Sequence, residues 1–211
     1  MARDPATWQL TTLNVNGIRS AARKGFVDWR KTCGADVIAL QELRIQPNQM
    51  TDEHTAPRGW KSIQANAEKK GYSGTSVWTR LDVDGPGVNT CGIPLADTEG
   101  RFTRMDTAEA AVISLYLPSG SSGTARQTIK EDFMDTFLEY SKGLLAEGRP
   151  VVICGDINIA HTAQDIHNPS GNKKNSGFLP SEREWMDRLL ALGWVDVFRQ
   201  LNPDSQEYSW W

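Results

Sequence analysis

The sequence has few cysteines, no long hydrophobic run and no excess of positive charge. Its three cysteines, Cys33, Cys91 and Cys154, are widely spaced and form no CxxC pair. This spacing argues against a zinc site and indicates reduced thiols, which are typical of a cytoplasmic protein. No apolar stretch approaches the length that crosses a membrane, and residues 1–4 do not resemble a signal peptide. We therefore expect a cytoplasmic protein without a membrane partner.

The charge balance is slightly acidic. The 211 residues carry 23 Lys and Arg against 26 Asp and Glu, a formal net charge of −3. General DNA binders are usually basic, so this balance argues mildly against nucleic-acid binding, although a small basic patch suffices for a catalytic contact. The length suits one domain with a sizeable core, and no repeat or linker divides it. We expect a single domain over residues 1–211 and a monomer.

Apolar runs and helical spacing predict the order of the elements. Strands are predicted over residues 8–15, 35–40, 60–65, 74–79, 101–106, 110–117 and 151–154, with the start of another at 207–210. Helices are predicted over residues 18–31, after the turn at 118–123, and from Ser181 with Glu184 in capping-box position. Residues 47–54 suit a short polar helix or turn, and residues 82–94 a loop. Because helices alternate with pairs of strands, we expect an α/β fold with two sheets packed face to face.

Polar side chains follow three of the predicted strands where each apolar run ends. They are Asn14 and Asn16, Gln41 and Glu42, and Asp156 and Asn158. Side chains placed there tend to meet at one end of a sheet. Two carboxylates and several amide oxygens form a hard oxygen cage, which suits Mg²⁺ or Mn²⁺. Glu42 is the strongest ligand candidate, although a glutamate in a loop is more often exposed.

The segment from Pro150 to Phe178 carries most of the chemistry. Gly155 breaks a buried strand, and Asp156 and Asn158 then place two polar side chains on one face. A carboxylate and a carboxamide at the end of a buried strand are costly unless something binds them. Further along, residues 172–175 supply two cations and two amides, which suit phosphate oxygens. A solvated surface loop is the alternative for these lysines.

Several motifs identify a family. They are Gly155-Asp156-x-Asn158 with His161, Asn168-Pro169, Gly171-Asn172-Lys173-Lys174-Asn175-x-Gly177-Phe178, Tyr116-x-Pro118-x-Gly120 and Tyr208-Ser209-Trp210-Trp211. Together with Gln41-Glu42 they closely resemble the exonuclease III branch of the abasic-site endonucleases, within the endonuclease/exonuclease/phosphatase superfamily. The resemblance implies a four-layer αββα sandwich of two packed mixed sheets, with the active site at one edge.

The resemblance also implies roles for individual residues. The metal would be held by Asn14, Glu42, Asp156 and Asn158. Asp156 would orient or deprotonate the attacking water, Asn158 would steady charge on the phosphoryl oxygens, and Tyr116 would contact or protonate the phosphate. DNA would be bound by Asn16, Asn172, Lys173, Lys174, Asn175 and Trp210.

Three of these positions have ordinary structural alternatives. Asn16 suits a turn before Gly17 nearly as well as a site. Tyr116 suits a half-buried strand tyrosine, and His161 suits a surface position better than a metal ligand.

The resemblance implies a Mg²⁺-dependent DNA phosphodiesterase of base-excision repair. It would nick double-stranded DNA 5′ to abasic sites and remove nucleotides or blocks from 3′ ends. Two alternatives stay open: a related phosphatase acting on phospholipid or inositol phosphates, and a non-catalytic DNA-binding pseudo-enzyme.

The chain stops after Trp211. The family continues there with further strands, an Asp within a strand and a Ser-Asp-His block whose histidine contacts the scissile phosphate. We therefore expect a truncated copy that lacks its last strands, with little or no activity and reduced stability.

Overall fold

The computed structural model describes residues 7–208, so the predictions for residues 209–211, including a DNA contact by Trp210, lie outside the described residues. The chain divides into two compact units, each described here by itself. The first comprises the residues up to Tyr116 together with Gly148–Asp156, and the second comprises Leu117–Glu147 and the residues from Ile157 onward. The single domain expected over residues 1–211 stays a prediction.

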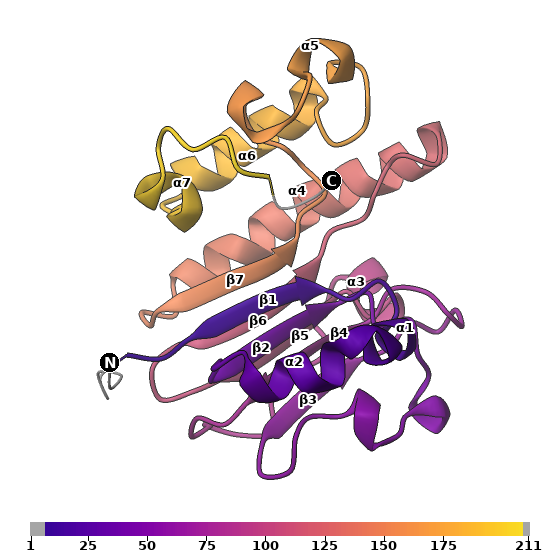
Figure 1. Cartoon of the computed structure of the whole chain (residues 1–211). Helices are drawn as coiled ribbons and strands as arrows, with labels where there is room; N and C mark the ends of the chain where they lie inside the picture. The colour runs from indigo at the N-terminus through magenta and orange to yellow at the C-terminus, as the bar shows by residue number, and fades with distance from the viewer. Residues whose placement is uncertain (1–6, 209–211) are drawn as a thin grey trace. The chain divides into compact units, whose positions relative to one another are not determined.

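The first unit contains two mixed β-sheets (Figure 1). The strands of the larger sheet, in spatial order, are β1 (Leu10–Asn14), β2 (Val37–Gln41), β4 (Thr75–Thr79) and β3 (Lys61–Ala65). β1 runs parallel to β2, whereas β4 is antiparallel to both of its neighbours. The smaller sheet contains β5 (Phe102–Asp106), β6 (Ala111–Tyr116) and β7 (Val151–Asp156). β6 is antiparallel to β5 and parallel to β7.

The two sheets pack face to face, as predicted. Side chains alternate across a strand, so Val37 points to one face of β2 and Ile38 to the other. Val37 joins Val77, Met105 and Val112 in a buried cluster formed by both sheets. Each such side chain contributes about 1.5–3 kcal/mol when it is fully buried. The predicted α/β fold with two packed mixed sheets is therefore confirmed.

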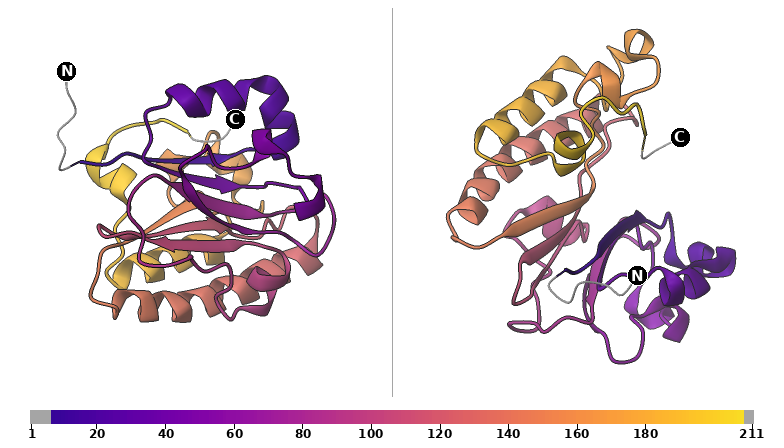
Figure 2. Two further views of the ribbon diagram at one scale, coloured as in Figure 1. Left: turned by 90° about the horizontal axis from the view of Figure 1, so that it is seen from below. Right: turned by 60° about the vertical axis from the view of Figure 1, so that its left-hand side comes forward.

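A second core covers the other face of the larger sheet (Figures 1 and 2). The helical elements that pack on this face are α1 (Ile18–Ala21), a π-helical turn η1 (Ala22–Phe26) and α2 (Val27–Thr32). The prediction of one continuous helix over residues 18–31 is wrong at one position. Gly25 takes a φ of 101°, a left-handed value that interrupts the helix. The change of direction places Phe26 edge-on to Trp78 of β4, with ring centres 5.9 Å apart.

The remaining elements of the first unit are short. The polar stretch 47–54 forms two 3₁₀ turns, η2 (Pro47–Gln49) and η3 (Asp52–His54), as predicted. The predicted loop 82–94 ends in a helix that was not predicted, α3 (Pro94–Thr98). A proline at the first helical position is the local signal for this start.

In the second unit, α4 (Thr124–Leu145) and α6 (Pro180–Ala191) lie side by side (Figure 1). The indole N–H of Trp185 in α6 donates to the carbonyl oxygen of Met134 in α4 at 2.7 Å. The predicted cap of α6 is wrong: the helix begins one residue before Ser181, and Glu182 rather than Glu184 accepts from the backbone of Leu179. Glu182 therefore supplies the side chain of the N-terminal cap that was predicted to involve Ser181 and Glu184.

Three short elements complete the second unit: η4 (Ala163–Asp165), α5 (Pro169–Asn172) and α7 (Val197–Leu201). The strand predicted from residue 207 is absent at Glu207 and Tyr208, the two of its residues that the structure describes. Within residues 7–208, no helix is long and apolar enough to cross a membrane.

Candidate active site

Four predicted site residues stand at the ends of strands in the first unit. Asn14, Tyr116 and Asp156 are the last residues of β1, β6 and β7, and Glu42 directly follows β2. Because parallel neighbours end at the same edge of a sheet, each parallel pair brings its terminal side chains together. The structure therefore assembles four of the residues singled out in the sequence at one place.

The amide of Asn14 links the two carboxylates. Its Nδ2 donates to Glu42 Oε1 and to Asp156 Oδ2, both at 2.9 Å. An amide NH₂ group has two protons, so this arrangement uses its full donor capacity. The Oδ1 atom of Asn14 accepts from the backbone N–H of Asn16 at 2.9 Å, which fixes the orientation of the amide. Two negative groups are thus held around one neutral donor.

Glu42 is buried and conformationally constrained. It is 8% exposed and has a φ of 55°, which is uncommon for a residue other than glycine. Its carbonyl oxygen accepts from the backbone N–H of Gly17 at 2.7 Å, and its Oε2 pairs with the guanidinium of Arg44. These contacts hold a glutamate that would otherwise extend into solvent, which agrees with the expectation that it is not an ordinary loop residue.

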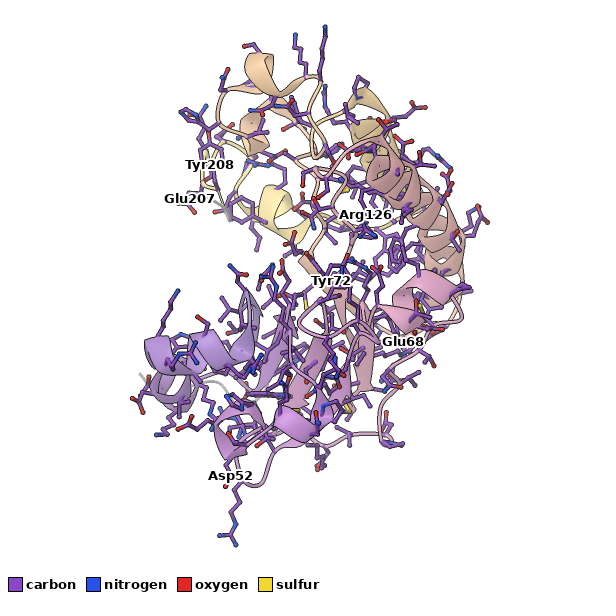
Figure 3. All side chains as sticks on the ribbon, turned by 90° about the vertical axis from the view of Figure 1, so that its right-hand side faces the viewer. Asp52, Glu68, Tyr72, Arg126, Glu207 and Tyr208 are labelled. Carbon is purple, nitrogen blue, oxygen red and sulfur yellow. The ribbon has the colours of Figure 1, made fainter. Side chains whose placement is uncertain are left out.

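Tyr116 hydrogen-bonds through its side chain with Glu42. Burial raises the pKa of the phenol above its ordinary value, and the neighbouring Glu42 carboxylate raises that pKa further. The phenol therefore stays protonated at neutral pH and keeps an O–H to donate. Arg101, which was not predicted from the sequence, stacks against this ring. It also donates to the hydroxyl of Tyr72 at 2.8 Å (Tyr72 is labelled in Figure 3).

Gly155 allows β7 to approach β6 closely just before Asp156. Its φ is 142°, and a β-carbon added there would lie 1.9 Å from the carbonyl oxygen of Leu115. Only glycine fits this position without moving one of the strands. The glycine of the Gly-Asp-x-Asn motif therefore sets the position of the carboxylate that follows it.

Asn158 belongs to the second unit and has a left-handed backbone, with a φ of 53°. Its Nδ2 donates to the carbonyl oxygen of Leu117 at 2.8 Å. Its own carbonyl oxygen accepts from the ammonium group of Lys130 at 2.7 Å. Both ends of this residue are therefore tied to defined partners within its unit.

The predicted DNA-binding loop also lies in the second unit. Asn172 donates to the carbonyl oxygen of Asn168 at 3.0 Å, and Asn175 donates to Asn172 Oδ1 at 3.0 Å. Lys173 and Lys174 are exposed. The two amides shape the turn and leave both cations on its surface, where a phosphate group could reach them.

Two other predicted residues have different surroundings. The Nε2 atom of His161 lies 2.7 Å from Asp187 Oδ1 in the second unit, and its side chain is 18% exposed, so His161 is a half-buried histidine beside a carboxylate. Asn16 is exposed and has a φ of 45°, so it forms the turn that was the alternative to a site role. Its side chain faces solvent, and its DNA contact stays a prediction.

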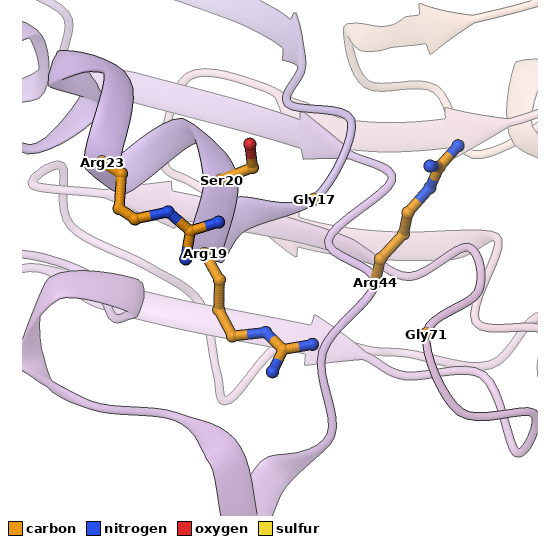
Figure 4. A pocket seen from close by; sticks show the side chains of 6 residues that line it. All are labelled: Gly17, Arg19, Ser20, Arg23, Arg44 and Gly71. Carbon is orange, nitrogen blue, oxygen red and sulfur yellow. The ribbon is translucent and has the colours of Figure 1, made fainter.

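The first unit also contains a basic pocket that the sequence did not predict (Figure 4). It encloses about 430 Å³ and is lined by Arg19, Arg23 and Arg44, with Gly17, Ser20 and Gly71. Arg19 and Arg23 project from one helical segment, four residues apart, as spacing on a helix dictates. Arg44 connects this pocket to the carboxylate cluster, because it also pairs with Glu42. The i, i+4 arginines after Asn16-Gly17 were the available signal.

The chain matches the model of the Endonuclease/Exonuclease/phosphatase family over residues 11–211. It is 36% identical to an exodeoxyribonuclease of Bacillus subtilis (strain 168), over 96% of this chain and 79% of that protein. It is 33% identical to the DNA repair nuclease APEX1 of Danio rerio, over 98% of this chain and 67% of that protein.

The fold matches solved structures over nearly the whole chain. A 3′ phosphatase from Neisseria, solved with a product DNA hairpin, has a TM-score of 0.84 at 22% identity and covers 94% of this chain and 76% of its own. This likeness shows the fold, and the family match and the relatives at 33% identity or more show the ancestry. The chain belongs to the endonuclease/exonuclease/phosphatase family and is a relative of exodeoxyribonucleases and DNA repair nucleases.

Proposed function

We propose that this chain is a Mg²⁺-dependent DNA phosphodiesterase that nicks 5′ to abasic sites and clears nucleotides or blocks from 3′ ends. The observation that carries the proposal is the cluster in which the Asn14 amide joins Glu42 to Asp156, with Tyr116 on Glu42. The relatives named exodeoxyribonuclease and DNA repair nuclease support a DNA substrate.

Nucleases of this family generally depend on a divalent metal. Among residues 7–208, no group of three or more His, Cys, Asp or Glu side chains is arranged to hold one. The donor chemistry nevertheless fits, because Glu42 and Asp156 share one neutral amide donor and offer hard oxygens of the kind Mg²⁺ takes. Glu42 and Asp156 would hold the metal, with Mn²⁺ as a substitute for Mg²⁺. Asn14 would orient the two carboxylates through its NH₂ group, and the ligand roles of Asn14 and Asn158 stay predictions. A bound cation supplies Lewis-acid chemistry by polarising a phosphoryl oxygen and acidifying water.

The chain's own residues divide the remaining work. The Asp156 carboxylate would orient the attacking water and accept its proton. The Tyr116 hydroxyl, which keeps its proton because its pKa is raised, would donate a hydrogen bond to the phosphate. The Asn158 amide would donate to a phosphoryl oxygen as charge develops there.

The pocket of Arg19, Arg23 and Arg44 and the loop Asn172–Asn175 would contact the DNA backbone. Phosphate contacts of this kind position a protein on the duplex without reading its sequence. Local basic sites of this size are compatible with the net charge of −3, because only a few phosphates need to be neutralised.

The test uses the 211-residue chain and a duplex with one abasic site under single-turnover conditions, so that slow cleavage is also measured. We expect a single nick 5′ to the site, which appears with Mg²⁺ and disappears with EDTA. Asp156→Ala should abolish the nick while leaving duplex binding intact.

Two outcomes would favour the alternative functions. Release of phosphate from inositol phosphates, with no nick in DNA, would identify a phosphatase of the same family. Duplex binding that is unchanged by Mg²⁺ and never leads to a nick would identify a DNA-binding pseudo-enzyme.

A further inference from the structure

A buried ion pair joins the two long helices of the second unit. Lys130 of α4 and Glu182 of α6 are both completely buried, and Lys130 Nζ lies 2.6 Å from Glu182 Oε1. Taking two charges out of water is costly, and such pairs can often be replaced by apolar side chains without loss of stability. Stability alone is therefore a weak explanation for this pair.

Lys130 has a second partner. Its Nζ donates to the carbonyl oxygen of Asn158 at 2.7 Å. Asn158 has a φ of 53°, a left-handed conformation that asparagine adopts more readily than most residues and that local contacts select. The side chain of Asn158 is tied to the carbonyl oxygen of Leu117 at 2.8 Å. The ammonium group of Lys130 thus holds the carbonyl oxygen of this residue.

Glu182 holds the backbone of the turn that precedes α6. Its Oε2 accepts from the backbone N–H groups of Gly177 at 2.7 Å and Leu179 at 2.9 Å. The carbonyl oxygen of Gly177 in turn accepts from the N–H of Ala160 at 2.8 Å. The pair therefore ties together both ends of the segment 160–177, which contains the loop Asn172–Asn175.

We propose that Lys130 and Glu182 are positioning residues, which set the direction of the Asn158 amide and anchor the loop that follows it. The inference rests on the role proposed above for Asn158. Neither residue touches a reacting atom: Lys130 acts through the Asn158 carbonyl, and Glu182 acts by orienting Lys130 and the turn before α6.

The main variant is Lys130→Met with Glu182→Gln. Lys130→Met alone leaves a buried carboxylate without its cation and can fail to fold, whereas the double variant buries no charge. In single-turnover cleavage of an abasic duplex, we expect the maximal rate to fall at least tenfold and the half-saturating enzyme concentration to change less than twofold.

Trp185→Phe is the matched control. It removes a buried hydrogen bond between the same two helices but leaves Asn158 untouched. We expect it to lower the Tm while the maximal rate stays within twofold of the parent. A folded double variant that cleaves at the parental rate would overturn the proposal, and so would a control that loses activity in proportion to its Tm.

Two further measurements separate positioning from general damage. In the background of Asn158→Ala, the double variant should change the rate less than twofold, because residues that act through one partner are not additive. Hydrogen exchange of the amides of residues 157–160 should accelerate at least tenfold in the double variant and not in Trp185→Phe. A chain that never nicks DNA contradicts the proposed function, and hydrogen exchange then decides the positioning role by itself.

Discussion

The guanidinium of Arg101 lies 4.6 Å from the centre of the Tyr116 ring, and its Nη1 donates to the Tyr116 carbonyl oxygen at 3.0 Å. Arg101 is only 1% exposed, and its Nε pairs with Glu99 Oε2 at 2.7 Å. One planar cation therefore holds both the ring and the backbone of the tyrosine that contacts Glu42. A guanidinium suits this position because it can stack and donate in several directions at once.

Arg101→Met should lower the free energy of unfolding by about 3 kcal/mol, because it removes a buried cation that donates to Glu99 and to the Tyr116 carbonyl oxygen. Arg101→Lys should recover less than half of this loss, since an ammonium group has no planar fork. Urea unfolding measures both effects. Arg188→Met is the control, because Arg188 and Asp135 are both well exposed and their pair should contribute less than about 1 kcal/mol. Full recovery by lysine would show that charge alone matters.

Asp156→Asn should have opposite effects on stability and activity. The substitution keeps an oxygen that can accept from Asn14 but removes one of two carboxylates around a single amide. In metal-free buffer we expect the free energy of unfolding to rise by about 0.5–1 kcal/mol, as is common when a functional site is neutralised. Calorimetric titration should show Mg²⁺ affinity at least tenfold weaker, and the nick should disappear. A variant that is less stable without metal would contradict the account of the cluster.

The basic pocket should appear in the salt dependence of DNA binding. Arg19→Gln with Arg23→Gln removes two exposed cations from its wall. Each phosphate contact contributes about 0.9 to the slope of log K against log salt, so the slope should become shallower by about 2. Fluorescence anisotropy with an abasic duplex at several salt concentrations measures the slope. Lys31→Gln, an exposed neighbour that pairs with Asp28, should leave it unchanged.

The sequence predicted the strands and the clustering of the strand-end side chains, because both depend on local patterns, whereas the roles of these side chains stay predictions. Asn14, Glu42 and Asp156 each follow an apolar run, and strand pairing then brings them together. Arg101 and Lys130 could not be found in this way. The local pattern around each of them predicts an exposed residue. Each is buried because of partners that are distant in sequence, as Glu182 is from Lys130.

The helices also show that local sequence patterns do not determine every detail of the structure. Periodicity identified the helix after residue 17 but not the interruption at Gly25, because a left-handed glycine leaves the apolar spacing nearly unchanged. The cap of α6 was misplaced because Ser181 and Glu184 have capping-box spacing, while Glu182 is drawn to Leu179, Gly177 and Lys130 together. Tertiary partners decided what local spacing had left ambiguous.

Acid should weaken the second unit through Asp165, which pairs with Arg199 of α7 and accepts from the N–H and hydroxyl of Thr162, both at 2.7 Å. Burial opposes ionisation of this carboxyl, but these hydrogen bonds and the Arg199 charge outweigh it and lower its pKa below the ordinary value. A lowered pKa means that the folded state holds the proton more weakly than the unfolded state does. The stabilisation is therefore complete well above pH 4 and is lost as pH falls through the lowered pKa.

Asp165→Asn tests this directly. At pH 7 it should lower the free energy of unfolding by about 1–2 kcal/mol, the usual contribution of hydrogen bonds to a charged group. The difference between parent and variant should stay constant from pH 7 to pH 5 and shrink below about pH 4, because the parent carboxyl is then protonated as well. Urea unfolding at each pH gives the curve, with Asp28→Asn as an exposed control. A difference that grows as pH falls would reverse the sign and show that the Asp165 carboxyl is destabilised by its surroundings.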